Sequence, residues 1–151
     1  MKIYLAGPCD SENRTLMTII AKTIRANSDF EVYCPWELKI ENAWDISQEE
    51  WAKIVFNTDV EAIKKCDYMI VISNGRISSA GTNWEQGYAM GLNKPVAVIQ
   101  INNANTSLMI YWGCTLFTQV NLQTPEFNSE LQWVLDHMPM NYHAKCKTIL
   151  T

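Results

Sequence analysis

Residues 67–101 read DYMIVISNGRISSAGTNWEQGYAMGLNKPVAVIQI. The stretch begins with an apolar run over Asp67 to Ser73 and ends with a second apolar run over Val96 to Ile101. Each run predicts a strand that is buried on both faces, as is typical of a parallel sheet. The residues from Thr82 to Leu92 predict a helix between them. The stretch is therefore a strand–helix–strand unit, which indicates an α/β protein.

The same alternation of short apolar runs and longer amphipathic stretches continues on both sides. The further predicted strands are Lys2–Ala6, Phe30–Cys34 and Leu116–Val120, and the further predicted helices are Ser11–Ala26, Ser47–Lys65 and Ser129–Met138. We therefore expect one α/β domain over residues 1–151. Its five-stranded, mostly parallel sheet should carry helices on both faces.

Two of the predicted helices are supported by local sequence patterns. The residues Leu16, Ile19, Ile20 and Ile24 are spaced to share one face of the first helix. The sequence Ser47-Gln-Glu-Glu50 has the form of a capping box, which marks the start of a helix.

Ligands of open α/β sheets bind beyond the carboxyl ends of the strands. The loops Gly7–Asp10, Pro35–Trp36 and Ser73–Glu85 follow predicted strands and are expected to converge there. None of them contains the glycine pattern of a dinucleotide-dependent oxidoreductase or of a P-loop, so these two classes have no motif in their favour.

Composition excludes several classes of function. The chain has 151 residues, of which 48% are hydrophobic and 19% charged, which is enough for one core without a stabilising metal or disulfide. A net charge of −4 gives no general attraction to nucleic-acid backbones or anionic lipid. The opening residues MKIYLAGP lack the apolar region of a signal peptide, and no run approaches the roughly twenty apolar residues of a membrane span.

Cysteine usage indicates a reducing compartment. The five cysteines are odd in number and form no C-x-x-C pair, and both histidines lie near the end of the chain, away from any cysteine pair at ligand spacing. We expect free thiols, a cytoplasmic location and no structural metal. The cysteines are Cys9, Cys34, Cys66, Cys114 and Cys146, and the histidines are His137 and His143.

Glu85 has two interpretations. In the first, Thr82-x-x-Glu85 is a capping box, and the glutamate returns a hydrogen bond to the backbone. In the second, Glu85 lies near a helix start at the ligand edge of the sheet, where the helix dipole and backbone donors keep it ionised. An ionised carboxylate can attack the anomeric carbon of a nucleoside and form a covalent glycosyl-enzyme.

Four segments occur in order along the chain: KIYLAGP at 2–8, DVEAIKKCD at 59–67, GTNWEQGYA at 81–89 and KPV at 94–96. At this spacing they resemble the nucleoside 2-deoxyribosyltransferase family over about residues 1–113. The resemblance implies a flavodoxin-like (Rossmann-like) oligomer that moves a 2-deoxyribosyl group between nucleobases without metal or organic cofactor. Its partners would be small nucleosides or nucleotides, nucleobases and copies of itself.

The resemblance also implies roles for individual residues. Glu85 matches the nucleophile, Tyr4 the phenol that positions it, and Asp59 the acid that contacts the departing base. Without the resemblance, Tyr4 would be interpreted as a core aromatic and Asp59 as an exposed helical carboxylate. The residues that the resemblance places around the substrate are Gly7, Ser79, Gly81, Ser107 and Met109.

Two of these positions depart from the family pattern. Ser79 lies where the family usually has an aspartate that holds the sugar 5′-hydroxyl. Ser107 lies where the family uses an asparagine from a neighbouring subunit, so shared active sites in a homo-oligomer are implied. Serines at both positions resemble the related branch of 2′-deoxynucleoside 5′-monophosphate N-glycosidases. Arg14 or Arg76 could pair with a phosphate, whereas Asp10 would oppose one, and the transferase is therefore preferred over the hydrolase.

Two other classes of function stay open on the sequence. A flavodoxin-like domain could bind a nucleotide without catalysis, because fold alone does not fix function. A glutamate-dependent NAD glycohydrolase would break the same type of bond, and release of nicotinamide would identify it.

Overall fold

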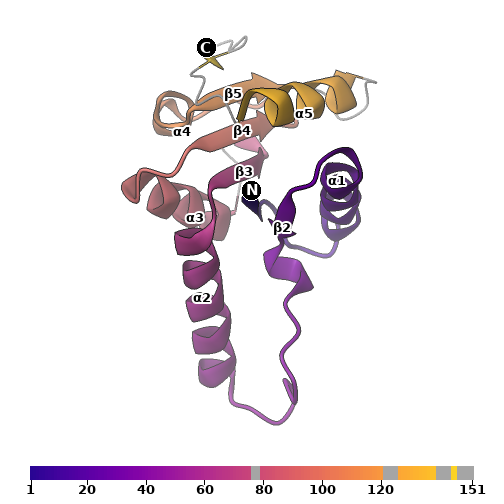
Figure 1. Ribbon diagram of the computed structural model, residues 1–151. Coiled ribbons are helices and arrows are strands. Elements are labelled where there is room, and N and C mark those ends of the chain that lie inside the picture. Colours follow the sequence, from indigo (N-terminus) through magenta and orange to yellow (C-terminus); the bar gives the residue numbers. More distant parts are fainter. Residues whose placement is uncertain (76–78, 121–125, 139–143, 146–151) are drawn as a thin grey trace.

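The computed structural model describes residues 1–75, 79–120, 126–138 and 144–145. Five strands form one sheet in the order β2-β1-β3-β4-β5, and every neighbouring pair is parallel (Figure 1). A two-residue strand, β6 (Ala144–Lys145), pairs with the edge of β5. The predicted five-stranded parallel sheet is confirmed. Its strands are β1 (Lys2–Ala6), β2 (Glu31–Tyr33), β3 (Tyr68–Ser73), β4 (Val96–Gln100) and β5 (Leu116–Gln119).

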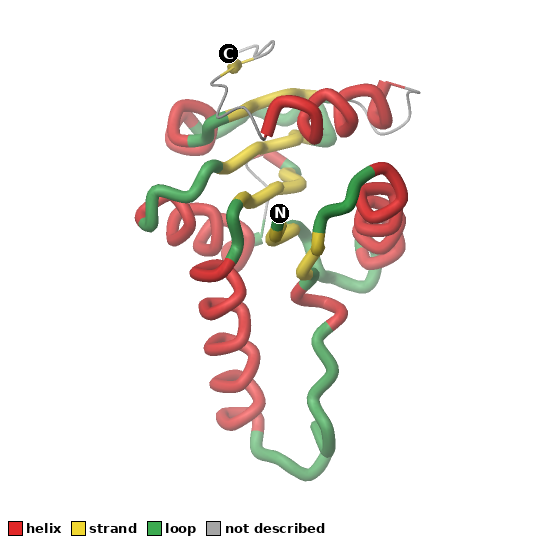
Figure 2. Tube along the Cα trace, in the orientation of Figure 1, coloured by secondary structure: helices red, strands yellow, loops and turns green. Residues whose placement is uncertain are grey.

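Helices cover both faces of the sheet (Figures 1 and 2). The predicted helices are present, with bounds that differ by a few residues. A short helix, α4, was not predicted because its six residues are too few for a periodic pattern. The helices are α1 (Arg14–Asn27), the 3-10 helix η1 (Pro35–Glu37), α2 (Gln48–Lys65), α3 (Ala80–Gly91), α4 (Leu108–Gly113) and α5 (Glu126–His137).

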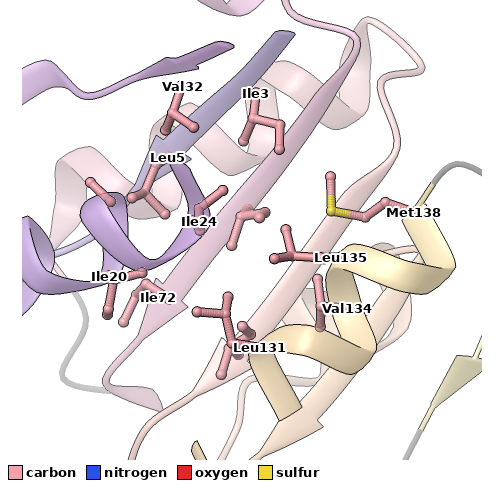
Figure 3. Close-up of a cluster of buried hydrophobic side chains, with 14 of the residues drawn as sticks. Ile3, Leu5, Ile20, Ile24, Val32, Ile72, Leu131, Val134, Leu135 and Met138 are labelled. Atoms are coloured by element: carbon pink, nitrogen blue, oxygen red, sulfur yellow. The ribbon is translucent and has the colours of Figure 1, made fainter. Parts of the chain in front are cut away.

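The core has two halves, one on each face of the sheet. Helices α1 and α5 pack on the face that carries Ile3, Leu5 and Ile72 (Figure 3). Helices α2, α3 and α4 pack on the opposite face, which carries Tyr4 and Val71. Successive strand residues point to opposite faces, so both sets are buried. This explains the unbroken apolar sequence of the central strands.

The buried stripe of α1 differs from the predicted one. Its fully buried residues are Met17, Ile20, Ala21 and Ile24, whereas Ile19 is 56% exposed. A helix turns by about 100° per residue, so position 19 lies roughly 130° from the centre of a stripe formed by positions 17, 20 and 24, near the opposite face of the helix. The prediction that Ile19 shares the buried face is therefore wrong.

Helix α2 begins as its capping box predicts, because the Ser47 hydroxyl accepts a hydrogen bond of 3.1 Å from the Glu50 amide. Only Ile63 of this helix is fully buried. The first part of α2 and the preceding residues 38–47 extend away from the sheet (Figures 1 and 2). Within the described ranges, none of the helices combines the length and apolar character that crossing a bilayer requires.

Candidate active site

A tyrosine and a glutamate meet at the carboxyl end of the sheet. Tyr4 in β1 is fully buried, and its hydroxyl donates a 2.8 Å hydrogen bond to Glu85 Oε1. Glu85 lies in the second turn of α3, on the side of the helix that faces β1. The two residues are 81 positions apart in the chain, so only the folded sheet brings them together.

Helix α3 is capped by a different residue from the one predicted. The helix begins at Ala80, and the Ser79 hydroxyl accepts a 3.2 Å hydrogen bond from the Thr82 amide. Thr82 therefore lies inside the helix, and the Thr82-x-x-Glu85 capping box is wrong. Because Ser79 satisfies the helix end, the Glu85 carboxylate is available to the Tyr4 hydroxyl.

A second tyrosine and a second carboxylate repeat this arrangement beside the first. Tyr33, the last residue of β2, donates a 2.7 Å hydrogen bond to Asp59 Oδ1 in α2. Tyr33 is the register partner of Tyr4, and the two rings stack with centroids 5.3 Å apart at 28°. Tyr33 was not predicted as a site residue. The only feature of the sequence that could have identified it is its position near the end of the predicted strand Phe30–Cys34.

The two carboxylates line one cavity of about 390 Å³. Each of the three segments expected to converge contributes to its lining, namely Cys9 after β1, Trp36 in η1 and Glu85 at the end of the third segment, and α2 contributes further residues. Residues that line it are Glu85, Asp59, Cys9, Arg14, Trp36 and Trp51. Among the residues that the structure describes, no group of three or more His, Cys, Asp or Glu is placed to hold a metal ion.

A second hollow, of about 510 Å³, lies on the other side of Tyr33. It is lined by Lys2 and Glu31, the first residues of β1 and β2, and by Lys65 at the end of α2. This hollow thus opens toward the amino ends of the strands. The smaller cavity is the better candidate site, because ligands of such sheets bind at the carboxyl ends.

The protonation of Glu85 differs from the expectation. The pKa of Glu85 is raised to about 7, chiefly by burial and in smaller part by the charge of Asp59, while the Tyr4 hydrogen bond opposes the increase. The helix start was expected to keep this carboxylate ionised. That prediction is wrong, because Glu85 lies in the second turn, beyond the unpaired amides of the first turn.

Asp59 is also affected by burial. Desolvation raises its pKa above the ordinary aspartate value, and the hydrogen bond from Tyr33 acts in the opposite direction. Burial and the neighbouring carboxylates raise the pKa values of Tyr4 and Tyr33, so both phenols remain protonated donors. Two carboxyl groups with raised pKa values in one cavity can hold one charge and one proton, as a nucleophile and an acid require.

The loop after β1 brings one cation to this cavity. Arg14 lines the cavity and forms no ion pair with a described residue. The carboxylate of Asp10 instead accepts hydrogen bonds of 3.0 Å from the amides of Glu12 and Asn13, at the turn that precedes α1. The Asn13 side-chain amide also donates to both Asp10 carboxylate oxygens, at 2.9 and 2.8 Å, and this contact, together with the backbone bonds, lowers the pKa of Asp10. The Asp10 carboxylate therefore accepts its hydrogen bonds from the turn before α1.

The two predicted glycines occupy different surroundings. A Cβ on Gly7 would overlap the end of the Met17 side chain and lie 2.8 Å from its sulfur. A larger residue at position 7 would therefore require the end of the Met17 side chain to move. A Cβ on Gly81, near the start of α3, would meet nothing within 4 Å.

Ser107 and Met109 lie apart from Glu85 within the same chain. They line a different hollow, of about 690 Å³, together with Gly75 and Asn83. Met109 is 78% exposed. The fold thus unites Glu85, Tyr4 and Asp59, and it places Ser107 and Met109 on a separate surface. Arg76 falls outside the described residues.

The sequence matches the family model of nucleoside 2-deoxyribosyltransferases over residues 3–138. The chain belongs to this nucleoside 2-deoxyribosyltransferase family. No curated protein matches the sequence.

Solved structures agree with this membership of the nucleoside 2-deoxyribosyltransferase family. A 2-deoxyribosyltransferase from Bacillus psychrosaccharolyticus is 29% identical, with a TM-score of 0.67 over 78% of this chain and 85% of that one. The CMP N-glycosidase BcmB of Clostridium botulinum has the same fold at 19% identity, with a TM-score of 0.60 over 88% and 99% of the two chains. A conserved protein from Enterococcus faecalis V583 also shares the fold, at 19% identity and a TM-score of 0.57 over 95% and 80%.

Proposed function

We propose that this protein cleaves the N-glycosidic bond of 2′-deoxynucleosides and transfers the deoxyribosyl group to another nucleobase. The observation that carries the proposal is the hydrogen bond from Tyr4 to Glu85, at the wall of a cavity that Asp59 also lines. Such a site offers a nucleophile, a donor that orients it and a separate acid. Membership of the family supports chemistry of this type.

In the first half of the reaction, one carboxylate oxygen of Glu85 attacks C1′ of the sugar. The bond between C1′ and the base nitrogen breaks, and its electron pair leaves with the base. Asp59 donates its proton to the departing base, which leaves as a neutral molecule. The sugar is then held as an ester of Glu85, with inverted configuration at C1′.

In the second half, a nitrogen of the incoming nucleobase attacks C1′, and the Glu85 carboxylate leaves. The incoming base passes its proton to the Asp59 carboxylate, which restores the starting state. Two inversions give overall retention. The Tyr4 hydroxyl is a fixed hydrogen-bond donor to Glu85, and it stabilises the carboxylate that is released.

We also propose that each site is completed by a neighbouring copy of the chain. Ser107 and Met109, which the family resemblance places at the sugar, lie in a separate hollow from Glu85. The surrounding α4 surface is strongly apolar, since Leu108 is 68% exposed and Trp112 is 78% exposed. Exposed apolar patches of this kind favour protein–protein contacts.

The direct test is to incubate the protein with 2′-deoxyadenosine and cytosine and to separate the products by chromatography. We expect deoxycytidine and free adenine. Glu85→Gln should abolish the reaction, whereas Glu49→Gln, a change on the exposed surface of α2, should leave it intact. A deoxyribosyl adduct on Glu85, detected by mass spectrometry after digestion, would support the covalent step. Absence of turnover with every nucleoside and nucleotide would contradict an enzymatic function.

A second candidate is hydrolysis of 2′-deoxynucleoside 5′-monophosphates. Arg14 favours it, because it is a cation without a described carboxylate partner at the cavity wall. Asp10 remains an ionised carboxylate, but both of its backbone hydrogen bonds lie at the turn before α1, which weakens the objection that it repels a phosphate. Incubation with each deoxynucleoside 5′-monophosphate would then give deoxyribose 5-phosphate and free base.

Arg14→Gln separates the two candidates, with Lys22→Gln on the exposed surface of α1 as the matched control. If a 5′-phosphate binds, Arg14→Gln should raise KM for nucleotides at least about tenfold and leave KM for nucleosides unchanged. An equal effect on both substrates would contradict recognition of phosphate by Arg14.

A further inference from the structure

We propose that Tyr33 is a positioning residue that fixes one carboxyl oxygen of Asp59 and leaves the other to face the departing base. This inference rests on the proposed function and adds to it a residue outside the catalytic set implied by the sequence. The Tyr33 hydroxyl donates to Asp59 Oδ1 at 2.7 Å, and Oδ2 has no hydrogen-bond partner among the described residues.

Tyr33 is itself held by the sheet. It ends β2, pairs in register with Tyr4 and stacks on the Tyr4 ring at 5.3 Å. Each phenol therefore leaves the same edge of the sheet and reaches a carboxylate on a different helix, Tyr4 to α3 and Tyr33 to α2. This fixes both carboxylates with respect to a common stacked pair of rings.

The position of Asp59 depends on a hydrogen bond from a strand tyrosine more than the position of Glu85 does. Helix α2 has one fully buried residue, Ile63, and its first part extends away from the sheet. Asp59 lies between these two regions, where packing alone constrains the helix weakly. A short hydrogen bond from a strand residue to a carboxylate is a strong and directional constraint. It ties α2 to β2 at the level of the cavity.

The same bond affects the proton on Asp59. A donor to a carboxylate stabilises its ionised form, and it therefore opposes the increase in pKa that burial causes at Asp59. Loss of the Tyr33 hydroxyl should raise the pKa of Asp59. The titratable and charged groups around this carboxyl are Tyr33 from β2, Tyr4 from β1, Glu85 from α3, and Cys9 and Arg14 from the loop and helix after β1.

The test compares Tyr33→Phe with Tyr68→Phe. Tyr33→Phe keeps the ring and its stacking on Tyr4 and removes only the hydroxyl. Tyr68 is a matched control, because it begins β3 at the opposite end of the strands, and its buried hydroxyl has no partner among the described residues. Release of free base from a deoxynucleoside is measured between pH 5 and 10 for both variants and for the unmodified protein. Separately, NMR titration of protein labelled with ¹³C at aspartate carboxyls follows Asp59.

We expect Tyr33→Phe to lower the maximal kcat about tenfold, because the acid is no longer held in place. The limb of its pH profile that follows ionisation of Asp59 in the NMR titration should move to higher pH, because Asp59 keeps its proton longer. The NMR titration should show the same increase in the pKa of Asp59. Tyr68→Phe should change none of these quantities.

Every other outcome overturns either the inference or the proposed function. A lower kcat with an unchanged pH profile and an unchanged Asp59 titration would indicate general structural damage and overturn the inference. A raised pKa of Asp59 in an enzyme with unchanged kcat and pH profile would also overturn it. If the unmodified protein releases no base, the proposed function fails, and the NMR titration then reports separately whether Tyr33 controls the Asp59 carboxyl.

Discussion

Tyr4 and Tyr33 are register partners on neighbouring parallel strands, and each donates its hydroxyl proton to a carboxylate on a different helix. Side chains that are register partners in a parallel pair point to the same face of the sheet. Their stacking therefore sets the separation of the two phenols. The positions of Glu85 and Asp59 follow from this pair of strands as much as from their own helices.

Tyr4→Phe should shift the acid limb of the pH profile. The Tyr4 hydrogen bond lowers the pKa of Glu85, which is about 7 in its presence. Without that bond the pKa of Glu85 should exceed 7, and less of the nucleophile is ionised at neutral pH. We expect kcat/KM at pH 6 to fall about tenfold or more, with partial recovery at pH 8. Initial rates across this range test the shift, and an acid limb that stays near pH 7 would contradict it.

Glu85→Gln should stabilise the protein in alkaline solution while it abolishes activity. The folded pKa of about 7 lies above the ordinary value of 4.5, so burial opposes ionisation of the carboxyl. Its contribution to stability is fully present below about pH 4.5 and is lost as the pH rises through 7. Glutamine does not ionise and avoids this loss.

The free energy of unfolding of Glu85→Gln should therefore exceed that of the unmodified protein by on the order of 2 kcal/mol at pH 8.5. The difference should shrink steadily toward pH 5. Urea unfolding at both pH values measures it, with Glu49→Gln as the exposed control. Equal stability of the variant and the unmodified protein at pH 8.5 would show that Glu85 ionises without penalty.

Mixed oligomers test whether neighbouring chains share a site. Glu85→Gln removes the nucleophile, and Ser107→Arg places a long charged side chain where a neighbour is expected to complete the site. Each variant alone should be inactive. Co-expression should restore about a quarter of the activity, because half of randomly formed dimers are mixed and each mixed dimer has one intact site.

Two outcomes of the mixed-oligomer experiment would contradict a shared active site. Full activity of Ser107→Arg alone would show that this surface lies outside the site. A co-expressed mixture that stays inactive, although ultracentrifugation shows that it is dimeric, would show that each chain builds its site alone.

Gly7→Ala should destabilise the protein by about 1–3 kcal/mol, because the added methyl group overlaps the end of Met17. Gly87→Ala is the matched control. It lies in α3 with nothing within 4 Å of the added Cβ, and it should stabilise the helix by about 0.5–1 kcal/mol. Denaturant unfolding measures both. If the clash is the cause, Gly7→Ala should cost less stability in a Met17→Ala background than in the unmodified protein, and an equal cost in both backgrounds would contradict it.

The strands were predictable because burial on both faces leaves a strong local signal. The apolar residues from Tyr68 to Ile72 and from Val96 to Ile99 contact helices on both sides of the sheet. The parallel arrangement follows from the alternation with helices. The six residues of α4 lack such a signal, since a single turn and a half of apolar residues has no distinct period.

The site was predictable only in part, because its physical chemistry depends on register and burial. Tyr33 became a site residue through its register with Tyr4 and its distance to Asp59, neither of which a sequence encodes locally. The pKa of Glu85 was predicted in the wrong direction because its depth in the cavity outweighs its nearness to a helix start. The cap lies three residues earlier than Thr82, at Ser79, because the ends of a helix are the feature that a sequence pattern defines least well.

The all-parallel sheet has a consequence for how the molecule reaches its native state. No two of the described strands are joined by a hairpin, and each pairing must wait for an intervening helix to form and dock. Such a high contact order favours slow folding, during which strands apolar on both faces are exposed to other chains. Recombinant production at low temperature and low protein concentration should therefore improve the soluble yield. Enzymatic activity, which needs β1, α2 and α3 together, should be among the last properties to return on refolding.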